Sequence, residues 1–258
     1  MIHIGTKRTE RKLGWVADFC PICRVPRAFQ LFRMGQATTI YGVALGPGTE
    51  LGYEIGCADC GTRLSIEKKR HATVEKVRPA DLSYLVLKTL PTMPEMFAER
   101  FALEGQIRQG VQALDSETRQ RCILEPFSLL NPELEKRREN SEVDRPAALG
   151  CVGTLVFIGL AIYAITQMPP AWQEQAAIAT AILAGAGFLY AFIQIGLSAR
   201  RFHRRVILKK VALALGPLQP TREELQAALE TCRQQKLIIG KWTTLEKLWP
   251  KLYPLRQA

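Results

Sequence analysis

The sequence lacks the motifs that mark most enzymes. None of its 258 residues falls in a glycine-rich phosphate loop, an HExxH or GxSxG motif, or a paired-carboxylate pattern. The only histidines are His3, His71 and His203, and none has a carboxylate or cysteine at a catalytic spacing. We expect His203 to belong to a basic stretch that faces a membrane, and the other two to be surface or packing residues. We therefore expect that the protein is not an enzyme.

Charge is nearly absent from one long stretch, although the chain as a whole has a net charge of +11. Residues 146–199 hold a single charged side chain, Glu174. Within them, 147–168 and 175–199 have no charge at all. A helix of 22 residues is about 33 Å long, enough to cross a hydrocarbon core of about 30 Å. We expect a transmembrane helical hairpin; the alternative is a helical pair buried in a soluble core.

The flanking charges orient this hairpin. The loop between the two stretches has no lysine or arginine, whereas Arg145 and the run that starts at Arg200 flank the outer ends. The positive-inside rule then places both termini in the cytoplasm. The N-terminal segment has no apolar stretch as long as a signal peptide's. The expected location is the inner (cell) membrane, with two spans.

Ionisable groups are missing from the interior of both stretches, where proton relays and ion pathways need them. We therefore interpret the hairpin as an anchor and not as a transporter. Small residues recur at every fourth position at Ala177, Ala181 and Gly185, and again at Gly187 and Ala191. Such rows allow two helix backbones to approach closely, within the hairpin or between copies.

Two CxxC pairs are the strongest chemical feature. Cys20-Pro-Ile-Cys23 and Cys57-Ala-Asp-Cys60 can each offer two thiolates from a tight turn to one tetrahedral ion. The residues between them favour strands and turn at Gly46-Pro47-Gly48, which predicts a β-hairpin that joins the two pairs. Four thiolates leave no open coordination position, so we expect a structural zinc ion.

Other interpretations of the cysteines are a rubredoxin-type iron site, a pair of disulfides, or a redox-active CxxC. A cytoplasmic location disfavours disulfides, and a redox site would need one CxxC in a βαβ setting. We interpret the other three cysteines, Cys122, Cys151 and Cys232, as small buried apolar residues.

The N-terminal quarter resembles the zinc-ribbon (rubredoxin-like) domains. The matching residues are Ile2-His3-Ile4-Gly5-Thr6-Lys7, Cys20-Pro-Ile-Cys23 and Cys57-Ala-Asp-Cys60-Gly61-Thr62. The resemblance implies that the four cysteines ligate the metal. Arg24 departs from the pattern, because many ribbons have glycine after the second cysteine. Ribbons serve nucleic-acid binding, protein docking or structural support, so the resemblance does not name a function.

The predicted fold is that of a multidomain membrane protein. Its parts are a small β zinc ribbon (1–66), a cytoplasmic helical segment and linker (67–145), the transmembrane hairpin (146–199), and a basic juxtamembrane helix with a small helical tail domain (200–258). In the second part, Pro94 suits a first helical position, and Asp115 can cap the helix that follows it. Asn131-Pro132 is expected to open a further short helix.

The tail carries much of the charge, with 13 basic and 4 acidic residues in 200–258. Thr221 and Thr243 each start a capping-box pattern, and 237–240 predicts a short strand or turn between them. The second of these helices is apolar, which favours packing against the middle helices over binding to DNA.

Six cations directly follow the second span. At about 1 kcal/mol each near an anionic leaflet, they can bind lipid headgroups, and phosphates of nucleic acid would attract the same charges. We favour the lipid bilayer as partner. The cations are Arg200, Arg201, Arg204, Arg205, Lys209 and Lys210.

Together these features predict a membrane-tethered, non-enzymatic interaction or scaffold protein with a protein partner. The alternative is a membrane-anchored nucleic-acid-binding regulator, suggested by Arg24, Arg27 and Arg33 near Phe29 and Phe32 and by the basic tail.

Overall fold

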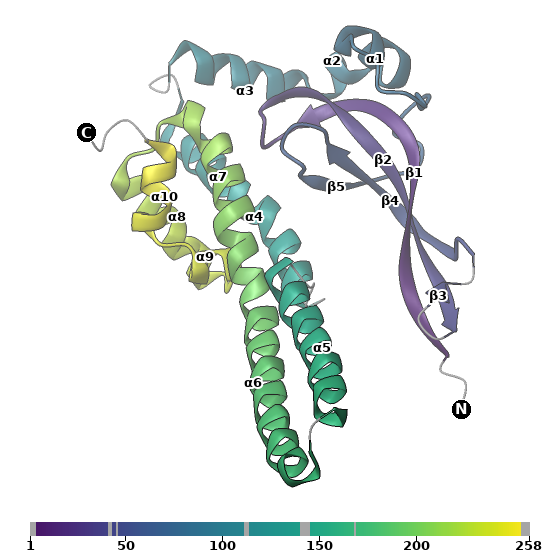
Figure 1. Ribbon diagram of the computed structural model, residues 1–258. Helices are drawn as coiled ribbons and strands as arrows, with labels where there is room; N and C mark the ends of the chain where they lie inside the picture. The colour runs from purple at the N-terminus through teal and green to yellow at the C-terminus, as the bar shows by residue number, and fades with distance from the viewer. Residues whose placement is uncertain are drawn as a thin grey trace.

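The computed structural model describes residues 4–40, 43–44, 46–110, 114–139, 145–167 and 169–253. An N-terminal antiparallel sheet is followed by helices (Figure 1). The strands follow the order β1-β2-β4-β5, and β3 pairs with β2. The hairpin expected between the CxxC pairs is formed by β2 and β4. The strands are β1 (Ile4–Cys20), β2 (Val25–Ile40), β3 (Val43–Ala44), β4 (Thr49–Cys57) and β5 (Arg63–Ile66).

The sheet is larger than the small ribbon that we expected. β1 and β2 have 17 and 16 residues and pair from Cys20 opposite Val25 to Ile4 opposite Ile40. A bulge at Gly14 interrupts the register, and a side chain there would come within 2.4 Å of the Glu75 carbonyl oxygen. The outer half of β1 is rich in charged residues and has no alternation of apolar and polar residues, so its sequence did not reveal a strand.

The helices follow in chain order. They are α1 (Leu82–Thr89), α2 (Met93–Met96), α3 (Ala98–Gln109), α4 (Ser116–Glu139), α5 (Arg145–Thr166), α6 (Pro170–Phe202), a π-helical turn η2 (His203–Ile207), α7 (Leu208–Leu215), a 3-10 turn η3 (Gly216–Leu218), α8 (Arg222–Gln234), α9 (Ile238–Trp242) and α10 (Leu245–Leu252).

The prediction of a new helix at Asn131-Pro132 was wrong, because α4 runs without a break through two prolines. Asp115 caps the helix as expected, since its Oδ1 accepts a hydrogen bond from the Thr118 N–H at 2.9 Å. Asn131 is buried, and its Oδ1 accepts from the Ile239 N–H at 3.1 Å. The asparagine therefore serves a tertiary contact between α4 and α9, and burial of α4 offsets the hydrogen bonds that its prolines cannot make.

The tail packs on α4 through α8 and α9. Thr221 forms the predicted capping box with Glu224. The second predicted box is absent, because the Thr243 hydroxyl pairs with the His203 ring at 2.9 Å, and α10 begins after Thr244. The expected strand or turn near residue 238 is the short helix α9.

Two helical stretches, α5 and the continuous path Pro170–Leu218, are long and apolar enough to cross a membrane. α5 and α6 pack side by side as a hairpin (Figure 1). The row of Gly187 and Ala191 faces α5, where a side chain at Gly187 would come within 2.6 Å of Thr154 Oγ1. The row of Ala177, Ala181 and Gly185 is exposed instead.

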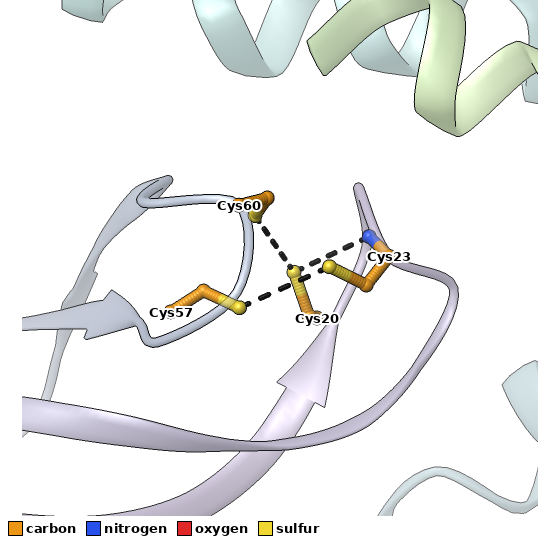
Figure 2. A group of neighbouring side chains, drawn as sticks. All are labelled: Cys20, Cys23, Cys57 and Cys60. Carbon is orange, nitrogen blue, oxygen red and sulfur yellow. Dashed lines mark hydrogen bonds between the residues drawn. The ribbon is translucent and has the colours of Figure 1, made fainter.

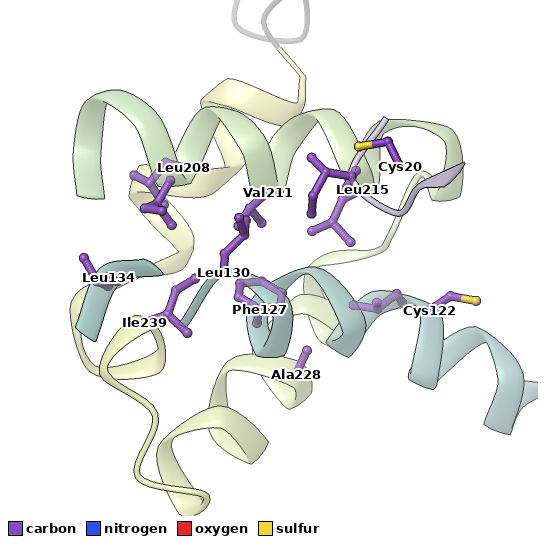
Figure 3. Close-up of a cluster of buried hydrophobic side chains, with 14 of the residues drawn as sticks. Cys20, Cys122, Phe127, Leu130, Leu134, Leu208, Val211, Leu215, Ala228 and Ile239 are labelled. Carbon is purple, nitrogen blue, oxygen red and sulfur yellow. The ribbon is translucent and has the colours of Figure 1, made fainter. Parts of the chain in front are cut away.

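One buried apolar cluster connects the sheet, α4 and the tail. Cys20 and Phe29 of the sheet belong to it, together with Phe127 of α4 and Leu215 of α7 (Figure 3). The end of the sheet that carries Cys20 therefore lies against the helices and shares their hydrophobic core.

Candidate metal centre

The four CxxC cysteines meet at one end of the sheet (Figure 2). Cys20 ends β1, and Cys23 lies in the turn that leads into β2. Cys57 ends β4, and Cys60 lies in the turn before β5. Because β2 pairs with β4 so that Phe29 lies opposite Cys57, the two turns are adjacent. The residues predicted from spacing are therefore brought together by the pairing of the strands.

The sulfur atoms have the spacing that a four-coordinate ion requires. In a regular tetrahedron with metal–sulfur bonds of about 2.3 Å, neighbouring sulfurs lie about 3.8 Å apart. The Sγ atoms of Cys20 and Cys60 are 3.6 Å apart, and those of Cys23 and Cys57 are 3.9 Å apart. All four lie within 4.8 Å of one another. A disulfide needs about 2.05 Å, and all seven cysteines are free. The cluster can hold a metal ion and is compatible with a zinc ribbon.

The crowded thiols oppose each other's ionisation. Contacts with Cys57 and Cys60, and then burial, raise the pKa of Cys20 above its usual value. Burial, and then the charges of Cys57 and Cys60, raise the pKa of Cys23 to about 12. Contacts with Cys20 and Cys57 lower the pKa of Cys60. The first thiolate to form therefore makes the next less favourable, and a bound cation removes this penalty by favouring all four thiolates.

The two CxxC turns have the same backbone conformation at their ends. The residue after each second cysteine has a left-handed conformation, with φ of 60° at Arg24 and 68° at Gly61. The Arg24 N–H donates to the Cys20 carbonyl at 2.7 Å, and the Gly61 N–H donates to the Cys57 carbonyl at 2.9 Å. Arg24 therefore holds the conformation that glycine adopts without strain. The departure from the ribbon pattern has not changed the turn.

The contacts of the Arg24 side chain explain why a non-glycine residue occupies this left-handed backbone conformation. It is 3% exposed, and its Nε donates to Glu104 Oε2 of α3 at 2.8 Å. Its Nη1 lies 3.4 Å from the carbonyl oxygen of Ala214 in α7. Arg100 binds the other Glu104 oxygen at 2.9 Å and Glu125 of α4 at 2.7 Å. A chain of ion pairs, buried at Arg24 and partly exposed at Arg100 and Glu125, thus joins the first CxxC turn to the helices.

Sequence analysis missed Glu104, which stands 80 residues from Arg24. It has no local pattern that distinguishes it from the other glutamates on the helices. Only the contact of α3 with the first CxxC turn, through Arg24 and Glu104, reveals its role.

None of the other described cysteines and histidines belongs to the four-cysteine cluster. Cys122 and Cys232 are buried as expected, and Cys151 is half-buried. The His71 Nε2 donates to the Ala17 carbonyl oxygen at 3.2 Å. His203 is 2% exposed, which corrects the expectation that it faces a membrane. His3 lies outside the described residues.

The six cations after the second span differ in their surroundings. Lys210 is buried, and its Nζ donates to both Glu133 oxygens at 2.8 Å. Arg201 is half-buried and donates to the backbone of Gln194 at 2.6 Å. The four exposed members are Arg200, Arg204, Arg205 and Lys209.

The arrangement supplies four sulfur ligands to one ion and ties the ligand turns to the helices. Four sulfur atoms gathered around one point are the ligand set of a four-coordinate metal ion. Comparisons of the chain with protein-family models, with curated proteins and with solved structures find no match.

Proposed function

We propose that this chain is a membrane-tethered, non-enzymatic scaffold protein whose zinc ribbon presents a protein-binding surface on the cytoplasmic side. The observation that carries the proposal is the closed four-sulfur cluster at the end of the sheet. A metal with four protein ligands stabilises structure and activates no water. The expected metal is zinc, because thiolate clusters of this geometry are typical structural zinc sites.

Membrane tethering is supported by the two apolar helices, in which 6% of the most apolar window is buried. A core helix of a soluble protein would be covered by other elements, whereas these helices contact chiefly each other. The flanking arginines favour the orientation with both termini in the cytoplasm.

The outer half of β1 offers a surface for a partner. Lys7, Arg8, Arg11 and Lys12 are exposed on this edge strand, and none of them has an ion pair with another described residue. An edge strand leaves backbone groups available for pairing, and its four cations favour an acidic protein segment.

The alternative function, a membrane-anchored nucleic-acid-binding regulator, has less support. Two of the three arginines suggested for it pair with carboxylates on the surface, Arg27 with Asp59 at 2.8 Å and Arg33 with Glu50 at 3.2 Å. Arg24 is buried, and so are Phe29 and Phe32. Stacking on bases requires exposed aromatic faces. Salt-sensitive retention of the detergent-solubilised protein on nucleic acid would restore this alternative.

Affinity capture from native membranes in mild detergent tests the scaffold function. The wild-type chain is compared with a Cys57→Ser/Cys60→Ser variant, which removes two of the four ligands. We expect a defined set of proteins with the wild type and its loss with the variant. The matched control is Cys151→Ser, which makes the same chemical change on α5, away from the cluster.

X-ray absorption of the purified protein supplies a second measurement that does not depend on a partner. Four sulfur neighbours at about 2.3 Å are expected around zinc. An oxygen neighbour in place of a sulfur would mean an open coordination position, which contradicts the structural role. Recovery of the same proteins by the wild type and the ligand variant would contradict docking through the ribbon.

A further inference from the structure

A cationic pocket lies where the path from α6 meets the tail. It has a volume of about 230 Å³. Three stretches of helix supply its walls: the end of α6 with η2, and the short helices α9 and α10 of the tail. The residues that line it are Arg200, His203, Arg204, Lys241, Trp242 and Lys247.

Four of these six side chains are cations, and no acidic side chain is among the lining residues. Arg200, Arg204, Lys241 and Lys247 are exposed, and among the described residues none of them forms an ion pair. Lys210, by contrast, forms an ion pair with Glu133. Four like charges around one pocket repel one another, and an anion inside it would remove that repulsion.

The back of the pocket is fixed. His203 is 2% exposed, and its Nε2 pairs with the Thr243 hydroxyl at 2.9 Å. The Trp242 ring meets the His203 ring edge-on, with 6.0 Å between the centroids. These contacts hold α9 against the end of α6, so the cations of both elements converge before any ligand arrives. A preformed site loses less entropy when it binds.

The chemistry of the lining selects a phosphate group. Two guanidinium groups can each donate two hydrogen bonds to neighbouring oxygens of one phosphate, and the two ammonium groups add point charges. At about 30 Å³ per water molecule, the pocket has room for a phosphate together with several waters. Its volume is too small for a folded partner.

The position of the pocket makes lipid headgroups one source of that phosphate. Arg200 directly follows the uncharged stretch 175–199, and Figure 1 shows α9 beside the end of α6. If the hairpin crosses a bilayer, this level coincides with the lipid phosphates.

We propose that this pocket binds a phosphate group, presented by a lipid headgroup or by a soluble phosphate compound. The proposal goes beyond the scaffold function and needs neither zinc nor a protein partner. It also changes the expected lipid contact from the six basic positions within 200–210 to Arg200 and Arg204, joined by Lys241 and Lys247 from the tail.

Direct binding measurements on the full chain in neutral detergent test the proposal. Equilibrium dialysis with radiolabelled inorganic phosphate covers the soluble source, at constant ionic strength set with chloride. Native mass spectrometry, with phosphatidic acid compared with phosphatidylcholine, covers the lipid source. We expect saturable binding of one phosphate-bearing ligand per chain in at least one arm, and the arm that saturates identifies the source.

Two double variants with equal loss of charge separate the pocket from general attraction. Lys241→Gln/Lys247→Gln removes two lining cations, whereas Lys209→Gln/Lys251→Gln removes two exposed cations that do not line the pocket. We expect the first to weaken binding at least about tenfold, because a hydrogen bond to a charged group is worth about one such factor. The second should change it by less than about twofold.

Two other outcomes would overturn the proposal. Equal weakening by both double variants would mean non-specific attraction to a basic surface. Absence of saturable binding in both arms would mean that the pocket is not a phosphate site. All four substitutions are at exposed positions, so unchanged thermal unfolding of the variants is the check that they remain folded.

Discussion

Replacing Arg24 separates the two roles that this residue has in the structure. As a non-glycine residue with φ of 60°, it holds a left-handed turn beside the metal cluster. As a buried cation, it neutralises Glu104. Arg24→Gly removes the ion pair but also relieves the backbone, whereas Arg24→Ala removes the ion pair and keeps the strain.

The expected losses of stability follow from the burial of the Arg24–Glu104 ion pair. Removing one partner of a buried ion pair costs about 3–5 kcal/mol. Here Glu104 keeps Arg100 at 2.9 Å, so we expect Arg24→Ala to lower the free energy of unfolding by about 2–3 kcal/mol. A left-handed conformation costs a residue with a Cβ about 1 kcal/mol more than glycine. Arg24→Gly should therefore cost about 1–2 kcal/mol.

Guanidinium unfolding of the zinc-loaded protein in detergent, followed by intrinsic fluorescence, measures both changes through the shift of the midpoint. Glu104→Gln, alone and combined with Arg24→Gly, completes a double-mutant cycle in which a coupling of about 1 kcal/mol or more is expected. Equal stability of the two Arg24 variants would refute the left-handed turn. A coupling near zero would refute the energetic role of the ion pair.

Three further changes test other parts of the structure. Gly61→Ala should lower stability by about 1 kcal/mol, because φ is 68° there and a Cβ meets no atom within 4 Å. Glu224→Gln should cost about 1 kcal/mol at neutral pH, since the Glu224 carboxylate accepts from Arg119 at 2.9 Å. Gly187→Val should lower the thermal stability of the hairpin, because its Cβ would lie 2.6 Å from Thr154 Oγ1.

Each of these has its own check. Arg119 lowers the pKa of Glu224, so this contribution is present above the usual value of 4.5 and is lost as the pH falls through the lower, folded value. The loss of stability caused by Glu224→Gln should therefore become smaller at acidic pH. A loss that stays the same at acidic pH would contradict the ion pair. For the hairpin, Gly196→Val is the control, since nothing lies within 4 Å of a Cβ there. A loss of zinc affinity in Gly61→Ala without loss of stability would argue for direct distortion of the cluster.

The sequence predicted those features whose determinants are local. Each CxxC pair fixes two ligands within four residues, and the strand-forming residues between the pairs require a hairpin that brings the pairs together. The apolar helices were predictable because hydropathy summed over about 20 residues is a strong pattern. The capping residues Asp115 and Thr221 were recognised for the same reason, since a cap bonds within three residues.

The features that the sequence concealed depend on residues far apart in the chain. Asn131 with a following proline is a typical helix start, yet its side chain is used by Ile239, 108 positions away. Thr243 has the pattern of a cap, but its hydroxyl serves His203, 40 positions away. In both cases, a residue that local rules place at a helix terminus forms a buried hydrogen bond with a distant residue instead. A helix cap contributes about 1 kcal/mol, which does not exceed the cost of leaving a buried donor or acceptor without a hydrogen bond.

Long-range contacts also connect the apolar helices to the four-cysteine cluster. α6, η2 and α7 form one helical path from the hairpin to Ala214. Arg24 contacts the Ala214 carbonyl oxygen through its side chain, and its own N–H binds Cys20. The path from the apolar helices to the metal cluster thus passes through helix and a buried side chain, without a free linker. Buried, hydrogen-bonded contacts of this kind resist local unfolding, so a partner bound to the sheet would be held at a fixed position relative to the hairpin.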